Sequence, residues 1–230
     1  MVAPESDDNP WHYKISWNPR NVVLAGKAGA IYKSEGKVIE EKYEQLFDDS
    51  RMVTLESENN ASFSFYPNRN SLPYIELYEL NDTETFVRTT LRYSDFMKGW
   101  NNLIELNLTD ENPCYATDGL SLQEFYKQHF SKHGFKNWLD DKMNQQFAEV
   151  DESLKAMDSL IANAKSNEEL EKLKNEGTAL VANKMSEANL ILKQLFYLGL
   201  NDNETIINKG FCSAADVLQF ALEKKLALNP

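Results

Sequence analysis

The feature that most constrains this chain is a change in the spacing of its apolar residues near residue 90. Before that point, short runs alternate or are rich in aromatic and β-branched side chains, which is typical of strands. After it, apolar residues recur every three to four positions over long segments, which indicates helices. The sequence therefore predicts an α+β fold, with a mixed β-sheet region over residues 1–90 and an all-α helical region over residues 91–230.

Turn residues and capping residues set the bounds of the expected elements. The expected strands are 13–17, 21–24, 30–33, 37–40, 62–66, 74–80 and 85–90, with a turn at 34–36 and a stop at Pro67. The expected helices are 94–106, 122–132, 135–164, a short charged helix from 166, 178–198 and 213–226. Ser94 and Ser121 stand where N-caps belong, and Glu124 completes a capping box with Ser121.

Composition excludes several classes of partner. The chain has 36 acidic and 24 basic residues, a net charge of −12, and this disfavours nucleic acids and anionic membrane surfaces. No run approaches the roughly 18–20 apolar residues of a membrane helix, and the acidic N-terminus lacks the apolar core of a signal peptide. Two separated cysteines, Cys114 and Cys212, are typical of free thiols in a reducing compartment. We therefore expect a cytoplasmic protein that binds neither nucleic acid nor membrane.

The sequence lacks the motifs of self-contained catalysis. The glycines of Ala25-Gly-Lys-Ala-Gly29 have the wrong spacing for a dinucleotide fingerprint, and no P-loop is present. His129 and His133 are spaced like metal ligands on a helix, but no glutamate follows His129 and no third ligand is evident. We expect no catalytic group, no cofactor-binding residue and no metal site.

Two stretches place arginine where it could bind a ligand. Arg20 follows Pro19 and precedes the expected strand 21–24, and Tyr66-Pro-Asn-Arg69 presents Asn68 and Arg69 from a rigid turn. A guanidinium binds a carboxylate with two parallel hydrogen bonds. Each stretch is equally compatible with a plain structural role, as a surface ion pair or as the closure of a loop.

Several stretches resemble, in order, the saccharopine dehydrogenase family of the glutamate-forming type. They are NPWHYKISWNPRNVVLAGKAGAIYKSEGKVIE, FSFYPNRNSLPYIELYEL, TFVRTTLRYSDFMKGWNNLIELNL and LFYLGLNDNETIINKGFCSAADVLQFALEKKLAL. The motifs YPNRxS and TLRY are the specific part of this likeness. Asn70 departs from the family's aspartate, and the helices between 135 and 189 do not align with it.

The resemblance implies the substrate-binding and dimerisation part of an NAD(P)-dependent oxidoreductase of lysine metabolism, acting on a CH–NH bond in saccharopine. The family's N-terminal Rossmann domain has no counterpart in this sequence. We therefore expect NADP or NAD to bind only in the full-length parent, this part alone to be inactive, and the sheet to be incomplete. It also implies a homodimer, and it implies Arg20 as a substrate contact in a cleft facing the Rossmann domain. Further implied contacts are Asn68, Arg69, Arg92 and Tyr93.

Two other interpretations remain open. A carboxyspermidine-type dehydrogenase of the same superfamily would bind a diamine, so an acidic residue beside Arg20 would favour it. A non-enzymatic helical interaction module would expose an apolar patch on its helices and would lack converging arginines.

Overall fold

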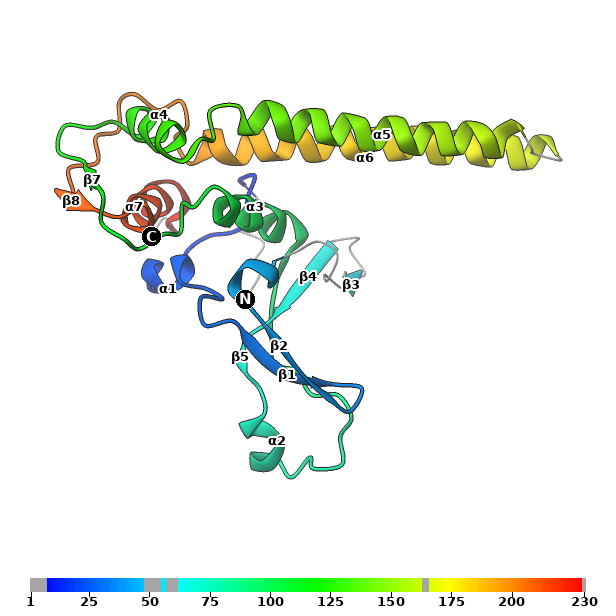
Figure 1. The fold of residues 1–230 in the computed structure, drawn as a ribbon, viewed down its shortest axis with the longest axis horizontal. Helices are drawn as coiled ribbons and strands as arrows, with labels where there is room; N and C mark the ends of the chain where they lie inside the picture. Colours follow the sequence, from blue (N-terminus) through cyan, green and yellow to red (C-terminus); the bar gives the residue numbers. More distant parts are fainter. Residues whose placement is uncertain (1–7, 48–54, 57–61, 163–165, 229–230) are drawn as a thin grey trace.

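The computed structural model describes residues 8–47, 55–56, 62–162 and 166–228, and it confirms the α+β class. Figure 1 shows small sheets on one side of a central helix and a long pair of helices on the other. Most strands precede residue 93 and most helices follow it, in the expected order. Within the described residues, no helix combines the length and apolar character that crossing a membrane requires.

Two three-stranded sheets form the first part of the chain. Their strands are β1 (Ala30–Ser34), β2 (Lys37–Glu41), β3 (Leu55–Glu56), β4 (Ser62–Pro67), β5 (Arg69–Asn70) and β6 (Thr89–Tyr93). One sheet has the order β2-β1-β5, with β2 antiparallel and β5 parallel to β1. The other is antiparallel, with the order β3-β4-β6. The expected strands at 30–33, 37–40 and 62–66 are confirmed.

The helices after residue 93 also follow the sequence closely. The helices of the described residues are α1 (Pro19–Val23), the 3-10 turn η2 (Tyr43–Gln45), α2 (Pro73–Leu77), α3 (Ser94–Glu105), α4 (Leu122–His133), α5 (Trp138–Ala162), α6 (Asn167–Tyr197) and α7 (Ala214–Leu226). The predicted capping box of α4 is present, since Ser121 Oγ accepts from the Glu124 N–H and the Glu124 carboxylate accepts from the Ser121 N–H. This reciprocal pair satisfies two of the donors left open at a helix start.

A short sheet of two strands lies among the later helices. It pairs β7 (Tyr115–Ala116) with β8 (Phe211–Cys212) in antiparallel fashion. Strands of two residues leave no periodicity in the sequence, so the patterns missed them. Cys114 and Cys212 lie at this sheet, and both are free thiols, as expected.

Helix α3 lies at the centre of one apolar core that takes residues from both parts of the chain. Its Phe96 and Trp100 rings stack with centroids 5.2 Å apart, and Trp11 meets both rings edge-on. Gly99 faces α6, where an added Cβ would lie 2.5 Å from Gln194 Oε1. The close approach of α3 and α6 therefore depends on glycine at this position.

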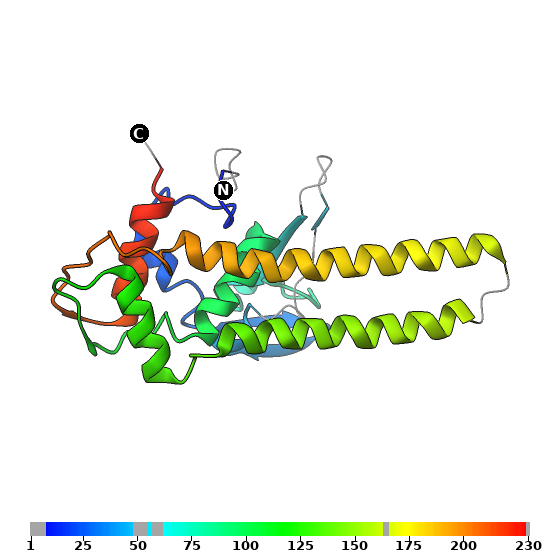
Figure 2. The ribbon, with the colours of Figure 1, turned by 90° about the horizontal axis from the view of Figure 1, so that it is seen from above.

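Helices α5 and α6 form a long antiparallel hairpin that extends well beyond the core, as Figure 2 shows. Of the apolar residues at helical spacing along α5, Trp138 is buried and Phe147 is exposed. The others are half-buried, namely Met143, Val150, Leu154, Met157 and Ile161. The short charged helix and the helix at 178–198 were expected as separate elements, and this was wrong. They form the single helix α6, because Gly177 packs against Met157 of α5 and does not end the helix.

Three expected strands were wrong in kind or extent. Residues 21–24 lie in or beside helix α1, because Asn18 Oδ1 accepts from the Arg20 N–H at 2.9 Å and Pro19 occupies the first turn. Residues 74–80 contain α2 and a turn, and a proline again starts the helix. Residues 13–17 form only an isolated bridge, through Ile15 to Ala227.

Two boundaries also differ from the expectation. The strand expected at 85–90 begins at Thr89 and continues to Tyr93, and Phe86 forms only a bridge to Lys33. Ser94 is the first residue of α3 and not its cap, because its hydroxyl is hydrogen-bonded to Ser64 Oγ at 2.7 Å.

His129 and His133 serve the core and not a solvated helix end. The carbonyl of Leu106 accepts from His129 Nε2–H at 2.7 Å, so His129 Nδ1 accepts from the Tyr115 hydroxyl at 2.6 Å. The Tyr115 oxygen can then accept from His133 Nε2–H at 3.2 Å. Across the described residues, no three His, Cys, Asp or Glu side chains gather in a way that could hold a metal ion.

The buried histidine predicts a pH-dependent stability. Burial lowers the pKa of His129 from 6.5 to about 4, so the unfolded chain takes up the proton first as the pH falls. The free energy of unfolding should be unaffected by this group above pH 6.5 and should decrease from 6.5 towards 4. Between pH 7.5 and 5.0, urea unfolding of the wild type should lose about 2 kcal/mol more than His129→Gln does.

Val217→Ala is the matched control. Val217 is buried in the core and has no titratable group, so its replacement lowers the stability without removing a proton site. This variant should keep the pH dependence of the wild type. Equal pH dependence in the wild type and His129→Gln would contradict the prediction.

Candidate functional site

A pocket of about 370 Å³ lies between α1, with the turn that follows it, and the strands β4 and β6. Its wall contains four cationic side chains, namely Lys27, Arg69, Arg88 and Arg92. It also contains the aromatic rings of Trp17, Tyr66 and Phe96 and the amides of Asn21 and Asn68. Among the described residues no aspartate or glutamate belongs to this wall, in a chain with 36 acidic residues.

Extended backbone places the pocket arginines. Successive side chains of a strand point to opposite faces, so residues 88, 90 and 92 share one face of the stretch that includes β6. All three line the pocket. Tyr66 of β4 pairs with Thr90 in register, and the Asn68 N–H donates to the Arg88 carbonyl at 2.8 Å. Arg69 has a φ of 58°, so β5 begins with a residue in the left-handed region.

The pocket cations have no carboxylate partner among the described residues. None of the four lies within ion-pair distance of a carboxylate on any described residue. Arg92 donates from Nη1 to the Leu91 carbonyl at 2.9 Å, while its buried Nε–H has no partner among those residues. Burial raises the pKa of the neighbouring Tyr66 phenol, and the charge of Arg92 offsets part of this effect. Unpaired guanidinium groups at a pocket wall can bind anions.

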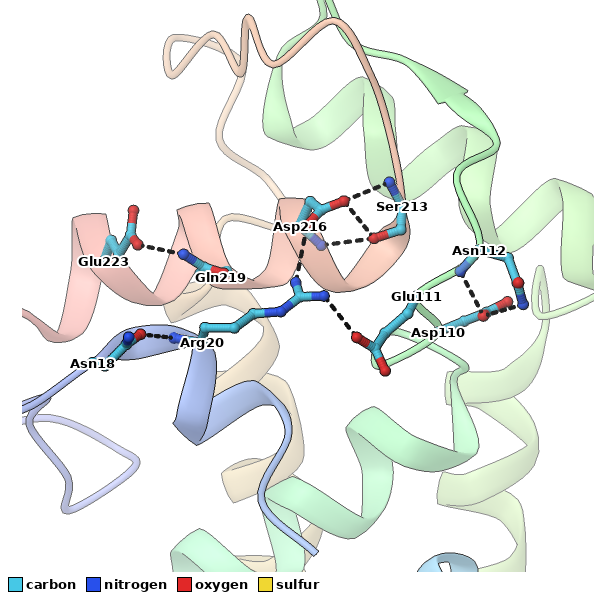
Figure 3. A network of polar contacts seen from close by, with 9 residues as sticks. All are labelled: Asn18, Arg20, Asp110, Glu111, Asn112, Ser213, Asp216, Gln219 and Glu223. Carbon is cyan, nitrogen blue, oxygen red and sulfur yellow. Dashed lines mark hydrogen bonds and ion pairs between the residues drawn. The ribbon is translucent and has the colours of Figure 1, made fainter. Parts of the chain in front are cut away.

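Arg20 occupies a different environment, shown in Figure 3. It lies in the first turn of α1, so its expected place at the mouth of a strand was wrong. Nη1 donates to Asp216 Oδ1 at 2.9 Å and Nη2 to Glu111 Oε1 at 2.7 Å. These ion pairs join α1 to α7 and to the loop that contains Glu111.

Asp216 is itself fixed in place. Its Oδ2 accepts from the N–H and the hydroxyl of Ser213, which completes the capping box of α7. Burial alone would raise the pKa of Asp216, but the Ser213 hydrogen bonds and the charge of Arg20 lower it. The carboxylate therefore stays ionised and holds Arg20 from a rigid position.

The structure brings together three of the five implied contacts. Asn68, Arg69 and Arg92 line one pocket, while Arg20 and Tyr93 do not belong to its wall. Tyr93 precedes α3 as its cap residue, and its ring meets those of Phe63 and His12.

Sequence reasoning missed several polar residues of the pocket, among them Asn21, Lys27 and Arg88. The alternation of Arg88 with Thr90 and Arg92 was visible in the sequence and is the signal that could have found Arg88. Lys27 lies in a turn without periodicity, so only the fold brings it to the site.

The fold is of the α+β class, and its pocket has a cationic wall. The family model for the saccharopine dehydrogenase C-terminal domain matches residues 1–230, and the chain belongs to this family. It is 34% identical over 125 residues to a saccharopine dehydrogenase [NADP(+), L-glutamate-forming] of Pyricularia oryzae, covering 54% of this chain and 27% of that protein.

Two further likenesses agree. The mitochondrial alpha-aminoadipic semialdehyde synthase of Mus musculus is 35% identical over 108 residues, which cover 47% of this chain and 12% of that protein. The apo histidine-tagged saccharopine dehydrogenase (L-Glu forming) of Saccharomyces cerevisiae shares the fold, with a TM-score of 0.66 and 24% identity over 100% of this chain and 44% of that one. The chain thus spans only part of the length of these proteins.

The ion pairs of Arg20 predict a stability effect. Arg20→Gln should lower the free energy of unfolding by about 1 kcal/mol, because the pairs are partly exposed and are screened by water. Urea unfolding at pH 7 measures this change. Arg69→Gln, at an arginine without an ion pair, should change it by less than about 0.5 kcal/mol. Equal effects of the two substitutions would show that the pairs of Arg20 add nothing to stability.

Proposed function

We propose that this chain is the substrate-binding part of an NADP-dependent saccharopine dehydrogenase, and that its pocket binds the carboxylates of saccharopine. The observation that carries this proposal is the set of four cationic side chains in a wall whose described residues include no carboxylate. The names of the curated relatives supply the substrate class and the cofactor.

The pocket suits a polycarboxylate in size and charge. Saccharopine has three carboxylates, and arginine offers each of them bidentate hydrogen bonds. The volume of about 370 Å³ falls in the range of small-molecule sites. The nicotinamide cofactor would carry the hydride, so the share of this chain is to hold and orient the substrate.

The two other interpretations have less support. A diamine site needs carboxylates, and the described part of the pocket wall has none. Glu111 and Asp216 do lie beside Arg20, but Arg20 already neutralises part of their charge. A helical interaction module fits the exposed Phe147, Leu160 and Met185 on α5 and α6, but it gives no reason for arginines to converge.

We also propose that the chain acts as a homodimer in the cytosol. Within the described residues β2 is an outer strand of its sheet, and an outer strand offers unpaired backbone groups to a second copy. The free thiols of Cys114 and Cys212 fit a reducing compartment.

Saccharopine binding tests the proposal directly. Titration calorimetry should show binding to the wild type, and Arg69→Gln or Arg88→Gln should each weaken it about tenfold, because each removes a charge-assisted hydrogen bond. Lys37→Gln removes an exposed cation on β2 outside the pocket and should change the affinity less than twofold. Wild-type affinity in both arginine variants would refute the proposed site. Arg20→Gln belongs to the same series, and a tenfold loss there would make Arg20 a substrate contact.

NADPH should not bind to this chain alone, because its sequence contains no phosphate-binding glycine turn. Calorimetric titration of NADPH into the wild type should give only heats of dilution. Micromolar binding would contradict the assignment of the nucleotide site to another part of the parent enzyme.

A further inference from the structure

Three of the four pocket cations stand over the rings of tyrosines. Lys27 Nζ lies 5.1 Å from the centroid of the Tyr43 ring, and the Arg88 guanidinium lies 4.1 Å from that of Tyr74. The Arg92 guanidinium lies 5.3 Å from the Tyr13 ring and 5.7 Å from that of Phe96. Tyr13, Tyr43 and Tyr74 do not belong to the pocket wall, so each of them meets the pocket only through the cation that it contacts.

An aromatic ring and a carboxylate hold a cation with different consequences. The face of a ring attracts a cation through its quadrupole, but it carries no net charge. A carboxylate would neutralise the cation and compete with an anionic ligand. The same chain shows this second arrangement at Arg20, which is paired with Asp216 and Glu111.

We propose that Tyr13, Tyr43 and Tyr74 are positioning residues that hold Lys27, Arg88 and Arg92 in place for a polycarboxylate while leaving their charge available. This inference rests on the proposed function of the pocket as a carboxylate site. It assigns a role to residues that do not themselves touch the ligand.

The pair of Tyr74 and Arg88 is the most completely fixed of the three. Both residues are tied to Ser71, which is fully buried. The Arg88 N–H donates to Ser71 Oγ at 2.9 Å, and the Tyr74 N–H donates to the Ser71 carbonyl at 3.1 Å. These hydrogen bonds hold the backbones of both residues beside Ser71, so the Tyr74 ring can orient the Arg88 guanidinium that lies over it.

Tyr13 has two links to the pocket. Its ring lies under Arg92 and is 4.8 Å from the ring of Phe96, while its hydroxyl accepts from Trp17 Nε1–H at 3.3 Å. Trp17 and Arg92 both line the pocket. Tyr13 thus fixes one aromatic and one cationic part of the wall.

Tyr74 offers the sharpest test, because it is only half-buried on the short surface helix α2 and its replacement spares the core. The proteins are the full chain as wild type, Tyr74→Leu, Tyr74→Phe, Arg88→Gln and the double variant Tyr74→Leu/Arg88→Gln. Calorimetry measures their binding of saccharopine and of tricarballylate, a tricarboxylate without amino groups. Tyr78→Leu is the matched control, since Tyr78 is exposed nearby and lies over no pocket cation.

Tyr74→Leu should bind both ligands about three- to tenfold more weakly, because the loss of a cation–π contact disorders the guanidinium. Tyr74→Phe keeps the ring and should bind within twofold of the wild type, as should Tyr78→Leu. The double variant should bind no more weakly than Arg88→Gln, because Tyr74 acts only through Arg88. A merely structural role of Tyr74 would instead make the two losses additive.

The outcomes separate the inference from the proposed function. Wild-type affinity in Tyr74→Leu, or additive losses in the double variant, would overturn the inference and leave the carboxylate site intact. Binding of tricarballylate without binding of saccharopine would refute the proposed substrate, and the cycle with tricarballylate would still decide the role of Tyr74. Binding of neither ligand by the wild type would overturn both.

Discussion

The contact between α3 and α6 is the constraint on which the rest of the structure depends. Because Gly99 has no side chain, Gln194 of α6 reaches past it and donates from Nε2 to the carbonyls of Pro10 and Asp95, at 3.0 and 2.9 Å. The Trp11 indole N–H donates to the backbone carbonyl of Gln194. A buried amide with several partners fixes geometry more sharply than apolar contact alone. It joins the N-terminal segment, α3 and α6 in one place.

The position of the pocket follows from this contact. Strand β6 runs directly into α3, so Arg92 lies two residues before the start of this largely buried helix and Phe96 lies in its first turn. The N-terminal segment continues from Trp11 to Tyr13 and Trp17. Trp17 lines the same pocket and donates its indole N–H to the Tyr13 hydroxyl. The pocket thus lies where two segments leave a shared, rigid core, and such a site can stay preorganised for its ligand.

Local chemistry decided which elements the sequence could predict. The helices α4 and α7 were predictable because a capping serine and a carboxylate three residues later lie within one turn of chain. Helix α1 also has start residues that the sequence shows, namely the cap Asn18 and Pro19 in the first turn. The apolar run that follows them was interpreted as a strand. In the site, Asn68, Arg69 and Arg92 were found from motifs and family likeness. Lys27 was not, because only tertiary packing brings its turn to the sheet.

The contrast between Arg20 and the pocket arginines shows how one residue type serves two purposes. In a chain with 12 more acidic than basic residues, an exposed arginine has many possible carboxylate partners. Arg20 has two of them and thereby joins α1 to α7. Among the described residues, the wall around Arg69, Arg88 and Arg92 contains no carboxylate, and the long-range repulsion among these cations is a cost to the folded state. Such repulsion is found mainly at sites where a ligand of opposite charge removes it, because the ligand then stabilises the folded state when it binds. Carboxylates lie beside Arg20 but not beside the pocket arginines among the described residues. This difference is the physical argument that favours the pocket, and not Arg20, as the ligand site.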